Sequence, residues 1–525
     1  MNVCQAFPLT ETNNLTPLIR DYITGKSELT HLYQYKPHIS SFAQAIADKS
    51  KSNVNRSVLV EVLQSQYAEI PSFELVKGNI ASLADENTFT VTAAHQPCLF
   101  HGPLYNVYKI AATIRLAQQL KEAYPQNNFV PVFWLGSEDH DIEELNHAYI
   151  NGTKIQFEGG KGTIGRLPAS VVQQPLAELK KLMGENPLVN VLEEGIKKFS
   201  SFGRLTQYFL NELFGDFGLV VIDQDDKRLK NLFAQVIVDE VFNSRALQVL
   251  QENLRFLDKN YKVQAQPREI NFFYLGEGFR ERIIYNKESD HYTVNNTGLS
   301  FTKEQLKHEI SSRPENFSPN VIHRPLFQEM ILPNLAFVGG GGELSYWLEL
   351  KPLFDYYRVN YPVLLLRNSA VIINTSVERK LQKLNLGVRD FYGDTEQLIT
   401  NYIKQHAGEE HSLTDEKKVI EALYAQIAKK AEGIDTTLKQ STETEKLKAL
   451  TGLGNLEAKM LKAEKRKQET TVNQIRTLKE TLFPQNNLQE RVENFIPYYS
   501  TAFVRDVVEA MSPMENTFVV FKAED

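Results

Sequence analysis

"NTFTVTAAHQPCLFHGPLYNVYKIAATIRLAQQLKEAYPQNNFVPVFWLGSEDHD", residues 87–141, contains two apolar strands with a helix between them. Thr, Val and Phe dominate residues 87–93, as is typical of a strand, and a loop with two prolines and a glycine follows at 94–103. Residues 104–124 hold apolar side chains at helical spacing without a breaker, and an apolar run resumes at 128–135. The order strand, loop, helix, strand predicts a βαβ unit in a parallel sheet.

The overall composition is that of an ordinary globular protein. The chain has 525 residues, of which 42% are hydrophobic, and this length suggests two to four structural units. Its net charge of -7 argues against a protein that mainly coats nucleic acid. No apolar run reaches the roughly 20 residues that span a bilayer, and no signal-peptide pattern opens the chain. Two cysteines, Cys4 and Cys98, cannot form a disulfide framework, so we expect a cytoplasmic protein with free thiols.

Further alternation of strands and helices follows the opening unit. Residues 217–242 continue with a strand and a helix, residues 324–357 with a helix, a short strand, a glycine loop and a helix, and residues 361–374 with another strand. This pattern predicts an α/β protein with a Rossmann-like, doubly wound parallel sheet. We expect residues 1–150 to form the first part of this core, 151–320 its continuation with an inserted connecting region, and 321–385 its last part. Residues 484–525 are apolar enough to pack back on it.

The segment 386–483 has a different character. Between 415 and 480 it is rich in Glu, Lys, Ala, Leu and Gln and has no proline. A spacing near 3.5 is kept by Ile420, Leu423, Ile427, Ile434 and Leu438. This predicts an α-helical coiled coil, interrupted at Gly452 and Gly454. We expect its apolar seam to form a homodimer, although pairing within one chain satisfies the same pattern.

The loop at 94–103 is the first candidate for chemistry. Ligands of open α/β sheets bind beyond the carboxyl ends of the strands, and this loop lies there. It also opens a helix, whose free N–H groups and partial positive charge suit phosphate or carboxylate. His95, Gln96 and His101 add polar side chains. The alternative is a tight turn with histidines that are hydrogen-bonded locally, and Cys98, in an apolar setting, is expected to be inert.

The second strand ends in a cluster of titratable groups, Glu138, Asp139, His140 and Asp141. In a parallel sheet they emerge beside the first loop, where carboxylates accept from hydroxyl or ammonium groups and His140 relays a proton. A metal site is disfavoured because neighbours on an extended chain point to opposite faces. Alternatively, some of these charges cap the next helix, with Asp141 three residues before Glu144.

Four glycines, Gly339 to Gly342, follow a later strand. They allow a close approach of the backbone to a ligand, but they lack the GxGxxG spacing of a dinucleotide site. Glu343, Tyr346 and Trp347 come on the helix that follows. The two aromatic residues suit a core as well as a ligand wall, and Glu343 also suits the positive end of the helix dipole.

Four motifs in a fixed order carry a family resemblance: "TAAHQPCLFHGPLYNVYKIAATIRLA", "PVFWLGSEDHDIEELNH", "RPLFQEMILPNLAFVGGGGELSYWLELK" and "LLLRNSAVIIN". With them the chain resembles, over nearly its whole length, the bacillithiol biosynthesis cysteine-adding enzyme family. The resemblance implies a Rossmann-like core related to class I nucleotidylyl transferases, a connecting region and a coiled coil that forms a homodimer. It also implies a cysteine ligase that joins cysteine to the amine of glucosaminyl malate. A departure is Ala94, where the family usually has glycine.

Forming an amide from a free carboxylate requires activation at neutral pH. We therefore expect ATP to activate the carboxyl group of cysteine, as an acyl-adenylate or an acyl phosphate. We expect no tightly bound metal. Catalysis would come from positioning and charge stabilisation. Arg324 and Arg367 suit the malate carboxylates because guanidinium pairs with them bidentately. The expected catalytic residues are His95, His101, Asp139 and His140. The expected substrate-binding residues are Gln96, Tyr105, Asn106, Glu138, Asp141, Arg324, Glu343, Tyr346, Trp347, Arg367 and Asn368. The expected nucleotide-binding residues are Gly102, Gly339, Gly340, Gly341 and Gly342.

Two other classes of function stay open. One is a nucleotide-binding coiled-coil scaffold without catalysis, and the other is a nucleotidylyl transferase or metal hydrolase that acts on another small substrate. Small-molecule substrates and a second copy of the chain are the expected partners, and neither nucleic acid nor membrane is. If the βαβ prediction is right, His95, His101, Asp139 and His140 line one cleft at the carboxyl ends of the strands. A scaffold would not need both the loop after the first strand and the cluster after the second to line one cleft.

Overall fold

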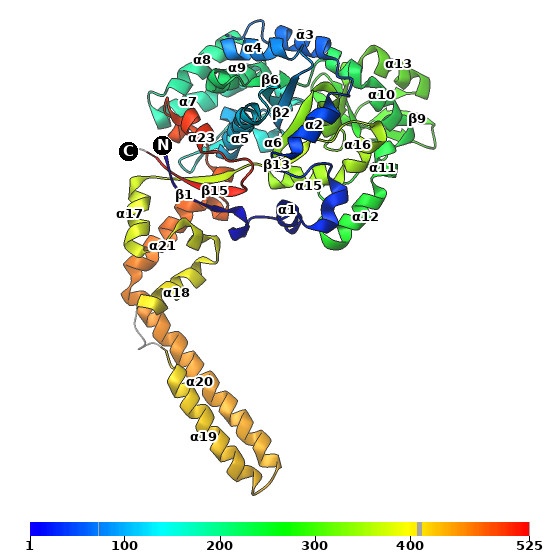
Figure 1. The fold of residues 1–525 in the computed structure, drawn as a ribbon. Helices are drawn as coiled ribbons and strands as arrows, with labels where there is room; N and C mark the ends of the chain where they lie inside the picture. The colour runs from blue at the N-terminus through cyan, green and yellow to red at the C-terminus, as the bar shows by residue number, and fades with distance from the viewer. Residues whose placement is uncertain (72, 407–411, 524–525) are drawn as a thin grey trace. The chain divides into compact units, whose positions relative to one another are not determined.

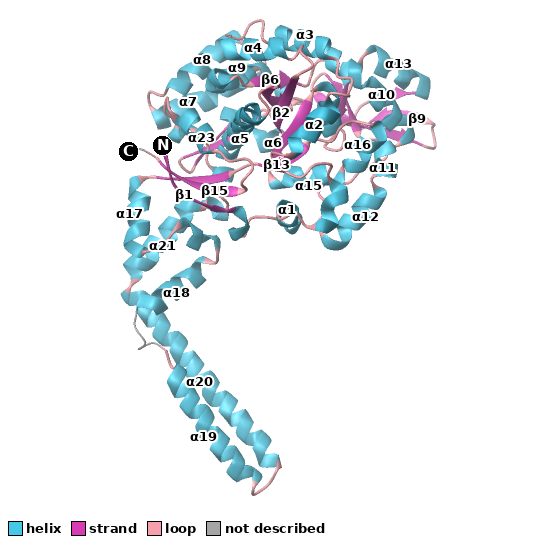
Figure 2. Cartoon of the chain, in the orientation of Figure 1, coloured by secondary structure: helices cyan, strands magenta, loops and turns pink. Residues whose placement is uncertain are grey.

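The computed structural model describes residues 1–71, 73–406 and 412–523 (Figures 1 and 2). The chain forms two compact units. Unit 1 consists of Met1–Ile372 and Asn487–Asp525, and unit 2 consists of Ile373–Asn486. Unit 2 is therefore inserted between two parts of unit 1 in the sequence. No helix among the described residues combines the length and apolarity needed to cross a membrane.

A five-stranded parallel sheet forms the centre of unit 1, as predicted. Its strands are β2 (Thr88–His95), β3 (Asn128–Leu135), β6 (Val220–Asp223), β12 (Asn334–Gly339) and β13 (Val363–Leu366). They lie in the order β13-β12-β2-β3-β6, and every neighbouring pair is parallel. The chain proceeds from β2 toward one edge and later returns to build the other edge from β12. The strand order therefore reverses between β2 and β12, which is where sheets of this class bind ligands.

The sequence of β2 explains its central position. Its residues from Thr88 to Ala94 are buried, so both faces of the strand are covered. The buried hydroxyl groups of Thr90 and Thr92 donate to Oδ1 of Asn334 on β12, at 3.1 and 2.8 Å. These bonds satisfy polar groups that would otherwise be costly to bury. They also join the two strands that flank the reversal point.

Helices cover both faces of this sheet (Figure 1). The predicted helix between β2 and β3 is α5 (Leu104–Ala123). The helices before β2 are α1 (Pro17–Ile23), α2 (Ser41–Lys49), α3 (Arg56–Gln66) and α4 (Glu74–Ser82). Those between β3 and β12 are α6 (Ile142–Leu145), α7 (Gln173–Met183), α8 (Pro187–Lys198), α9 (Phe202–Phe214), α10 (Lys227–Asn243), α11 (Arg245–Val249), α12 (Gln251–Asn260), α13 (Lys303–Ser312) and α14 (Arg324–Ile331). After β12 follow α15 (Gly341–Glu349) and α16 (Lys351–Tyr357).

A second, antiparallel sheet is inserted before β12. It contains β7 (Phe272–Gly276), β8 (Phe279–Asn286), β9 (His291–Val294), β10 (Ser300–Phe301) and β11 (Phe317–Pro319), in the order β10-β9-β8-β7-β11. A separate hairpin pairs β4 (His147–Ile150) with β5 (Thr153–Gln156). The antiparallel sheet provides one wall of the cavity described below.

The two ends of the chain meet in a third sheet of β1 (Asn2–Pro8), β14 (Ser369–Ile373) and β15 (Thr517–Lys522). β1 pairs antiparallel with β15, so that Asn2 lies opposite Lys522. β1 is not identified from the sequence alone, because its partner is at the far end of the chain. The C-terminal segment of unit 1 also holds α22 (Gln489–Val492) and α23 (Phe503–Ala510).

Unit 2 is helical, with α17 (Thr375–Leu384), α18 (Thr395–His406), α19 (Thr414–Glu432), α20 (Thr437–Lys467) and α21 (Glu469–Leu482). α19 and α20 lie side by side as a hairpin (Figure 1), where Lys417 Nζ contacts Glu457 Oε2 at 2.5 Å. The chain turns at residues 433–436. The predicted interruption at Gly452 and Gly454 is wrong, because both lie inside α20. A glycine costs about 1 kcal/mol there, which the surrounding helix-forming residues outweigh.

Candidate functional site

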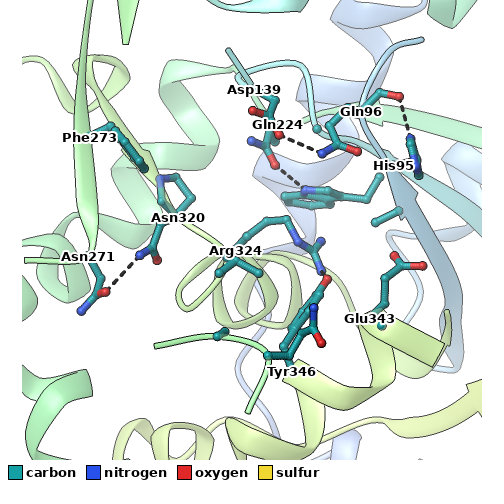
Figure 3. Close-up of a pocket in the computed structure, with 18 of the residues that line it drawn as sticks. His95, Gln96, Asp139, Gln224, Asn271, Phe273, Asn320, Arg324, Glu343 and Tyr346 are labelled. Atoms are coloured by element: carbon teal, nitrogen blue, oxygen red, sulfur yellow. Dashed lines mark hydrogen bonds between the residues drawn. The ribbon is translucent and has the colours of Figure 1, made fainter. Parts of the chain in front are cut away.

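A cavity of about 1030 Å³ lies at the carboxyl ends of the central strands (Figure 3). Its walls include His95 and Gln96 at the end of β2, Asp139 and His140 after β3, and the start of α15. The opposite wall is formed by the inserted sheet. The loop after β2 and the cluster after β3 therefore face one space, as predicted for both.

Most of the residues predicted for the site line this cavity. They are His95, Gln96, Tyr105, Asp139, His140, Arg324, Gly340, Gly341, Gly342, Glu343, Tyr346 and Arg367. They come from segments that are far apart in the sequence, and the reversal of strand order brings them together.

His101 does not line the cavity, so this part of the predicted convergence is wrong. Phe100, His101 and Gly102 all have positive φ, at 51°, 64° and 70°, and this left-handed turn directs the His101 ring onto Phe133. Burial lowers the pKa of His101 to about 3. At Gly102 a Cβ atom would lie 3.0 Å from the Cβ atom of Cys98, so the turn requires glycine there. Gly102 shapes the turn and is not among the residues that line the cavity.

Segments from the end of unit 1 hold this turn. Nδ2 of Asn494 donates to the carbonyl oxygens of Phe100 and Gly102, at 3.0 and 2.6 Å. The backbone N–H of Leu104, the first residue of α5, donates to the carbonyl oxygen of Glu493 at 2.8 Å. The strained conformation is therefore stabilised by residues almost 400 positions away.

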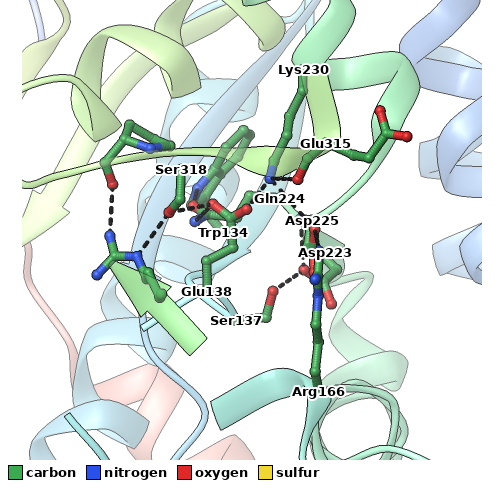
Figure 4. Close-up of polar contacts among 12 residues, drawn as sticks. Trp134, Ser137, Glu138, Arg166, Asp223, Gln224, Asp225, Lys230, Glu315 and Ser318 are labelled. Carbon is green, nitrogen blue, oxygen red and sulfur yellow. Dashed lines mark hydrogen bonds and ion pairs between the residues drawn. The ribbon is translucent and has the colours of Figure 1, made fainter. Parts of the chain in front are cut away.

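Glu138 also points away from the cavity. It is buried in an ion pair with Lys230 and accepts from Gln224 Nε2 at 2.8 Å and Ser318 Oγ at 3.1 Å (Figure 4). Glu138 and Asp139 are neighbours in the turn that follows β3, where Glu138 faces the interior and Asp139 faces the cavity. Asp141 is exposed and makes no side-chain cap to α6, so the predicted capping box is absent.

Four further predicted residues have structural positions outside the cavity. Trp347 is fully buried, and its ring stacks on Phe337 with centroids 4.5 Å apart. Asn368 donates to the carbonyl oxygen of Ser512 at 3.1 Å, and Asn106 to that of His101 at 3.0 Å. Gly339 belongs to β12, where its carbonyl oxygen accepts from the Arg367 N–H at 2.9 Å. These residues support the walls without forming them.

His95 has three hydrogen-bonding neighbours, Tyr105, Gln96 and Cys98, and the Cys98 Sγ atom lies 3.6 Å from Nδ1. Nε2 lies 2.9 Å from the Tyr105 hydroxyl group, and Nδ1 lies 3.1 Å from the carbonyl oxygen of Gln96. Burial, and then Lys109, lower the pKa of His95 to about 4, so the ring is neutral at pH 7. Burial raises the pKa of the nearby Cys98 thiol to about 12, which leaves it protonated and a poor nucleophile.

Asp139 and His140 form the other polar edge of the cavity. Gln96 Nε2 donates to Asp139 Oδ2 at 2.8 Å, and the His140 N–H donates to Asp139 Oδ1 at 2.7 Å. Burial acts to raise the pKa of Asp139, but the Gln96 bond and Arg280 outweigh it, so the carboxyl group is ionised at neutral pH. Burial and Arg280 lower the pKa of His140.

The Glu343 carboxylate has two partners, the ammonium group of Lys109 and the backbone N–H of Gly340. Its Oε2 lies 2.6 Å from Nζ of the fully buried Lys109 and accepts from the Gly340 N–H at 2.8 Å. Burial acts to raise the pKa of Glu343, but Lys109 outweighs it, and the pKa is lowered. Glu343 thus caps α15 and neutralises Lys109 at the cavity wall.

The cavity is strongly basic. Its lining contains Arg268, Arg280, Arg282, Arg324, Arg367 and Arg491, against the two carboxylates Asp139 and Glu343. Arg367 is paired with Glu490 at 2.8 Å, and its buried Nε has no hydrogen-bond partner among the described residues. Arg324 bonds the neutral side chains of Gln328 and Tyr346, at 3.0 and 3.4 Å. The arrangement suits a ligand with several negative charges.

Sequence reasoning missed the part of the site that lies on the inserted sheet and its flanking loops. Arg280 and Arg282 alternate along β8 and therefore share a face, which is the only available signal. Asn271 and Asn320, bonded to each other at 3.0 Å, line the same wall with Phe273 (Figure 3). Nothing local in the sequence indicates that this sheet covers the strand ends.

A Rossmann-like sheet with a basic cavity at its reversal point, joined to a unit of long helices, defines the class of this protein. Two family models match it: "Bacillithiol biosynthesis BshC, N-terminal Rossmann-like domain" over residues 3–368, and "Bacillithiol biosynthesis BshC, C-terminal coiled-coil domain" over residues 370–523. The chain belongs to the BshC family of bacillithiol biosynthesis.

Curated relatives agree with this assignment. A protein of Flavobacterium johnsoniae is 39% identical over 511 residues, covering 95% of this chain and 96% of its own length. One of Christiangramia forsetii is 38% identical and covers 98% of each chain, and one of Bacillus thuringiensis is 27% identical and covers 95% and 96%. All three carry the name "Putative cysteine ligase BshC". The family is thus one of ligases that form a carbon–nitrogen bond.

Proposed function

We propose that this chain joins L-cysteine to the amine of glucosaminyl malate, with nucleotide-dependent activation of the cysteine carboxyl group. The observation that carries the proposal is the charge of the cavity. Both the malate moiety and a triphosphate are polyanions, and the lining presents more guanidinium groups than carboxylates. Guanidinium groups bind carboxylate and phosphate through paired hydrogen bonds.

Arg324 is the residue that we assign to a substrate carboxylate. It is half-buried, its two side-chain hydrogen-bond partners are neutral, and it lines the cavity (Figure 3). An arginine held in this way by neutral groups keeps its full charge for a ligand. Arg367 is already neutralised by Glu490, so its assignment to malate is weaker than the sequence suggests.

The chain offers a fit for ATP at the start of α15. Gly340, Gly341 and Gly342 line the cavity there, and a Cβ atom at Gly340 would lie 3.7 Å from Nε of Arg367, which has no partner within the described part of the chain. Helix N-termini and guanidinium groups both bind phosphate. When bound, ATP supplies the phosphoryl or adenylyl group that activates the carboxyl group. The residues around it position the reactants and stabilise charge.

We also propose that two copies associate through the hairpin of α19 and α20. Val419, Leu423 and Ile427 follow helical spacing on α19 and are 66%, 48% and 41% exposed, and Leu447 on α20 is 61% exposed. The contact between α19 and α20 within one chain leaves these apolar side chains uncovered. A second copy would bury them.

The test is to incubate the purified chain with glucosaminyl malate, cysteine and ATP, and to search by mass spectrometry for bacillithiol and a nucleotide product. We expect both with the wild type, and a loss of product formation on the order of 10² in Arg324→Ala. Arg313→Ala is the matched control, because Arg313 is 66% exposed and does not line the cavity. A folded wild type that forms no conjugate would refute the function, and equal product without nucleotide would refute the activation step alone.

A further inference from the structure

We infer that the two cavity histidines hold opposite neutral tautomers and therefore have opposite roles. His95, acting through Tyr105, accepts the proton released in the reaction, whereas His140 only donates a hydrogen bond, and Arg280 is the positioning residue that restricts it. The roles rest on the proposed function, but the tautomers follow from hydrogen-bond partners alone.

The tautomer of His140 is set by Arg280. Nδ1 of His140 lies 2.9 Å from NH1 of Arg280. A guanidinium group has donors and no acceptor, so Nδ1 accepts, and the proton of the neutral ring is on Nε2. His140 then has no free lone pair, and the group it presents to a ligand is an N–H donor.

Arg280 cannot easily turn away from this contact. Its Nε donates to Ser318 Oγ and its NH2 to the carbonyl oxygen of Pro319, both at 3.0 Å. Its guanidinium carbon lies 3.9 Å from the centre of the Phe273 ring. The carboxylate of Asp139, 3.7 Å from Nδ1, favours a protonated ring, but the arginine contact is shorter and opposes it.

The tautomer of His95 is the reverse. Nδ1 lies 3.1 Å from a backbone carbonyl oxygen, that of Gln96, which accepts and cannot donate, so Nδ1 carries the proton. Nε2 therefore has the lone pair, and it accepts from the Tyr105 hydroxyl group at 2.9 Å. Cys98 Sγ lies 3.6 Å from Nδ1 and 3.5 Å from the same Gln96 carbonyl oxygen. A thiol is a weak donor, and an unprotonated Nδ1 would face the carbonyl oxygen lone pair to lone pair, so the thiol does not reverse this assignment. His95 and Tyr105 both line the cavity, so the pair can serve a bound ligand.

These tautomers assign the proton transfer of amide formation. The amine nitrogen of the sugar forms a bond to the activated acyl carbon, and the bond from that carbon to the phosphate or nucleotide leaving group breaks with its electron pair. The amine proton passes to Tyr105 Oη as Tyr105 gives its own proton to His95 Nε2. Tyr105 is never an anion in this relay, in agreement with the burial that raises its pKa above the usual value. His140 Nε2–H donates to an oxygen atom of the substrates.

Nitrogen-15 NMR of the full-length protein with labelled histidines tests the tautomers without any substrate. Signals of the two rings are assigned from their loss in His95→Gln and His140→Gln. We expect each ring to give the signals of a single neutral tautomer, with the proton on Nδ1 in His95 and on Nε2 in His140. In Arg280→Met the His140 signals should shift to a mixture of tautomers, and those of His95 should stay unchanged. The opposite tautomer at either ring, or an unchanged His140 in Arg280→Met, would overturn the inference.

Activity of glutamine variants tests the roles. A glutamine amide can replace an Nε2–H donor but cannot accept a proton. His140→Gln should therefore keep product formation within about tenfold of the wild type while His140→Ala loses on the order of 10². His95→Gln, His95→Ala and Tyr105→Phe should each lose on the order of 10² or more. Equal losses in His140→Gln and His140→Ala would contradict the donor role. If the wild type forms no conjugate, the proposed function fails, and the NMR result still stands or falls by itself.

Discussion

Replacing Lys230 with methionine should lower the free energy of unfolding of unit 1 by about 3 kcal/mol. The side chains of Lys230 and Glu138 are only 2% and 1% exposed, so the variant leaves a carboxylate without its cation in the interior. Breaking a buried pair in this way costs about 3–5 kcal/mol. We expect the lower end, because Glu138 keeps the donors Gln224 and Ser318, at 2.8 and 3.1 Å.

The pH dependence of this loss has a definite sign. Burial already raises the pKa of Glu138 in the folded protein, and removal of Lys230 raises it further. A carboxyl group with a raised folded-state pKa contributes stability while protonated and loses it as the pH rises through that pKa. The deficit of Lys230→Met relative to the wild type should therefore be larger at about pH 8 than at about pH 5.

Urea unfolding followed by tryptophan fluorescence measures this change, since Trp134 and Trp347 are the two tryptophans of the chain and both lie in unit 1. Lys227→Met is the matched control. Lys227 pairs with Glu315 from the same helix as Lys230, but the two side chains are 59% and 31% exposed, and the expected loss is under about 1 kcal/mol. The double variant Glu138→Gln, Lys230→Met should recover most of the stability. Equal losses in Lys230→Met and Lys227→Met would refute the reasoning.

Three further results are expected. His140→Ala should change the free energy of unfolding by no more than about 1 kcal/mol, because the side chain is 44% exposed, while product formation measured on the same sample falls on the order of 10²; full turnover would remove His140 from the site. If two copies associate as proposed, Val419→Glu with Leu423→Glu should sediment as a monomer, and the neighbouring Lys418→Glu should sediment as a dimer. A dimer in the first variant would contradict the proposed coiled-coil interface. Burial and Asp225 raise the pKa of Asp223 to about 7, so the protonated Asp223 stabilises the folded protein and this contribution is lost as the pH rises through that value. The melting temperature of Asp223→Asn should therefore fall less between about pH 5 and pH 8 than that of the wild type.

Local pattern was sufficient for the elements that build the central sheet. β2, α5 and β3 are each defined by a run of apolar residues with one period, and their order determines a parallel connection. β1 was not predicted because its first five residues are exposed and its partner β15 is over 500 positions away. The prediction of a break at Gly452 and Gly454 was also wrong. A glycine ends a helix only where a turn or a contact at that position requires the helix to end.

The site was predictable where residues lie at the end of a strand or in the loop after it, as at His95 and Asp139. It was not predictable where the backbone conformation of a few residues decides whether a side chain faces the cavity or the core. His101 turns inward because three successive residues are left-handed, and that conformation depends on Asn494. Arg280 reaches the site only because a separate sheet lies over the strand ends. Such docking is a property of tertiary packing, which no short motif encodes.

The contacts of Asn494 and Glu490 have a consequence for how the protein is made. A ribosome must complete unit 2 before it adds residues 487–525, which return to unit 1. Until then the turn at Phe100 lacks Asn494, Arg367 lacks its carboxylate partner, and β1 lacks β15. The nascent chain thus carries every cavity residue up to Arg367 for the time needed to synthesise more than a hundred further residues, with the binding site unfinished. Synthesis that stops within the helical unit would release a chain that has the reactive groups but not the geometry to use them.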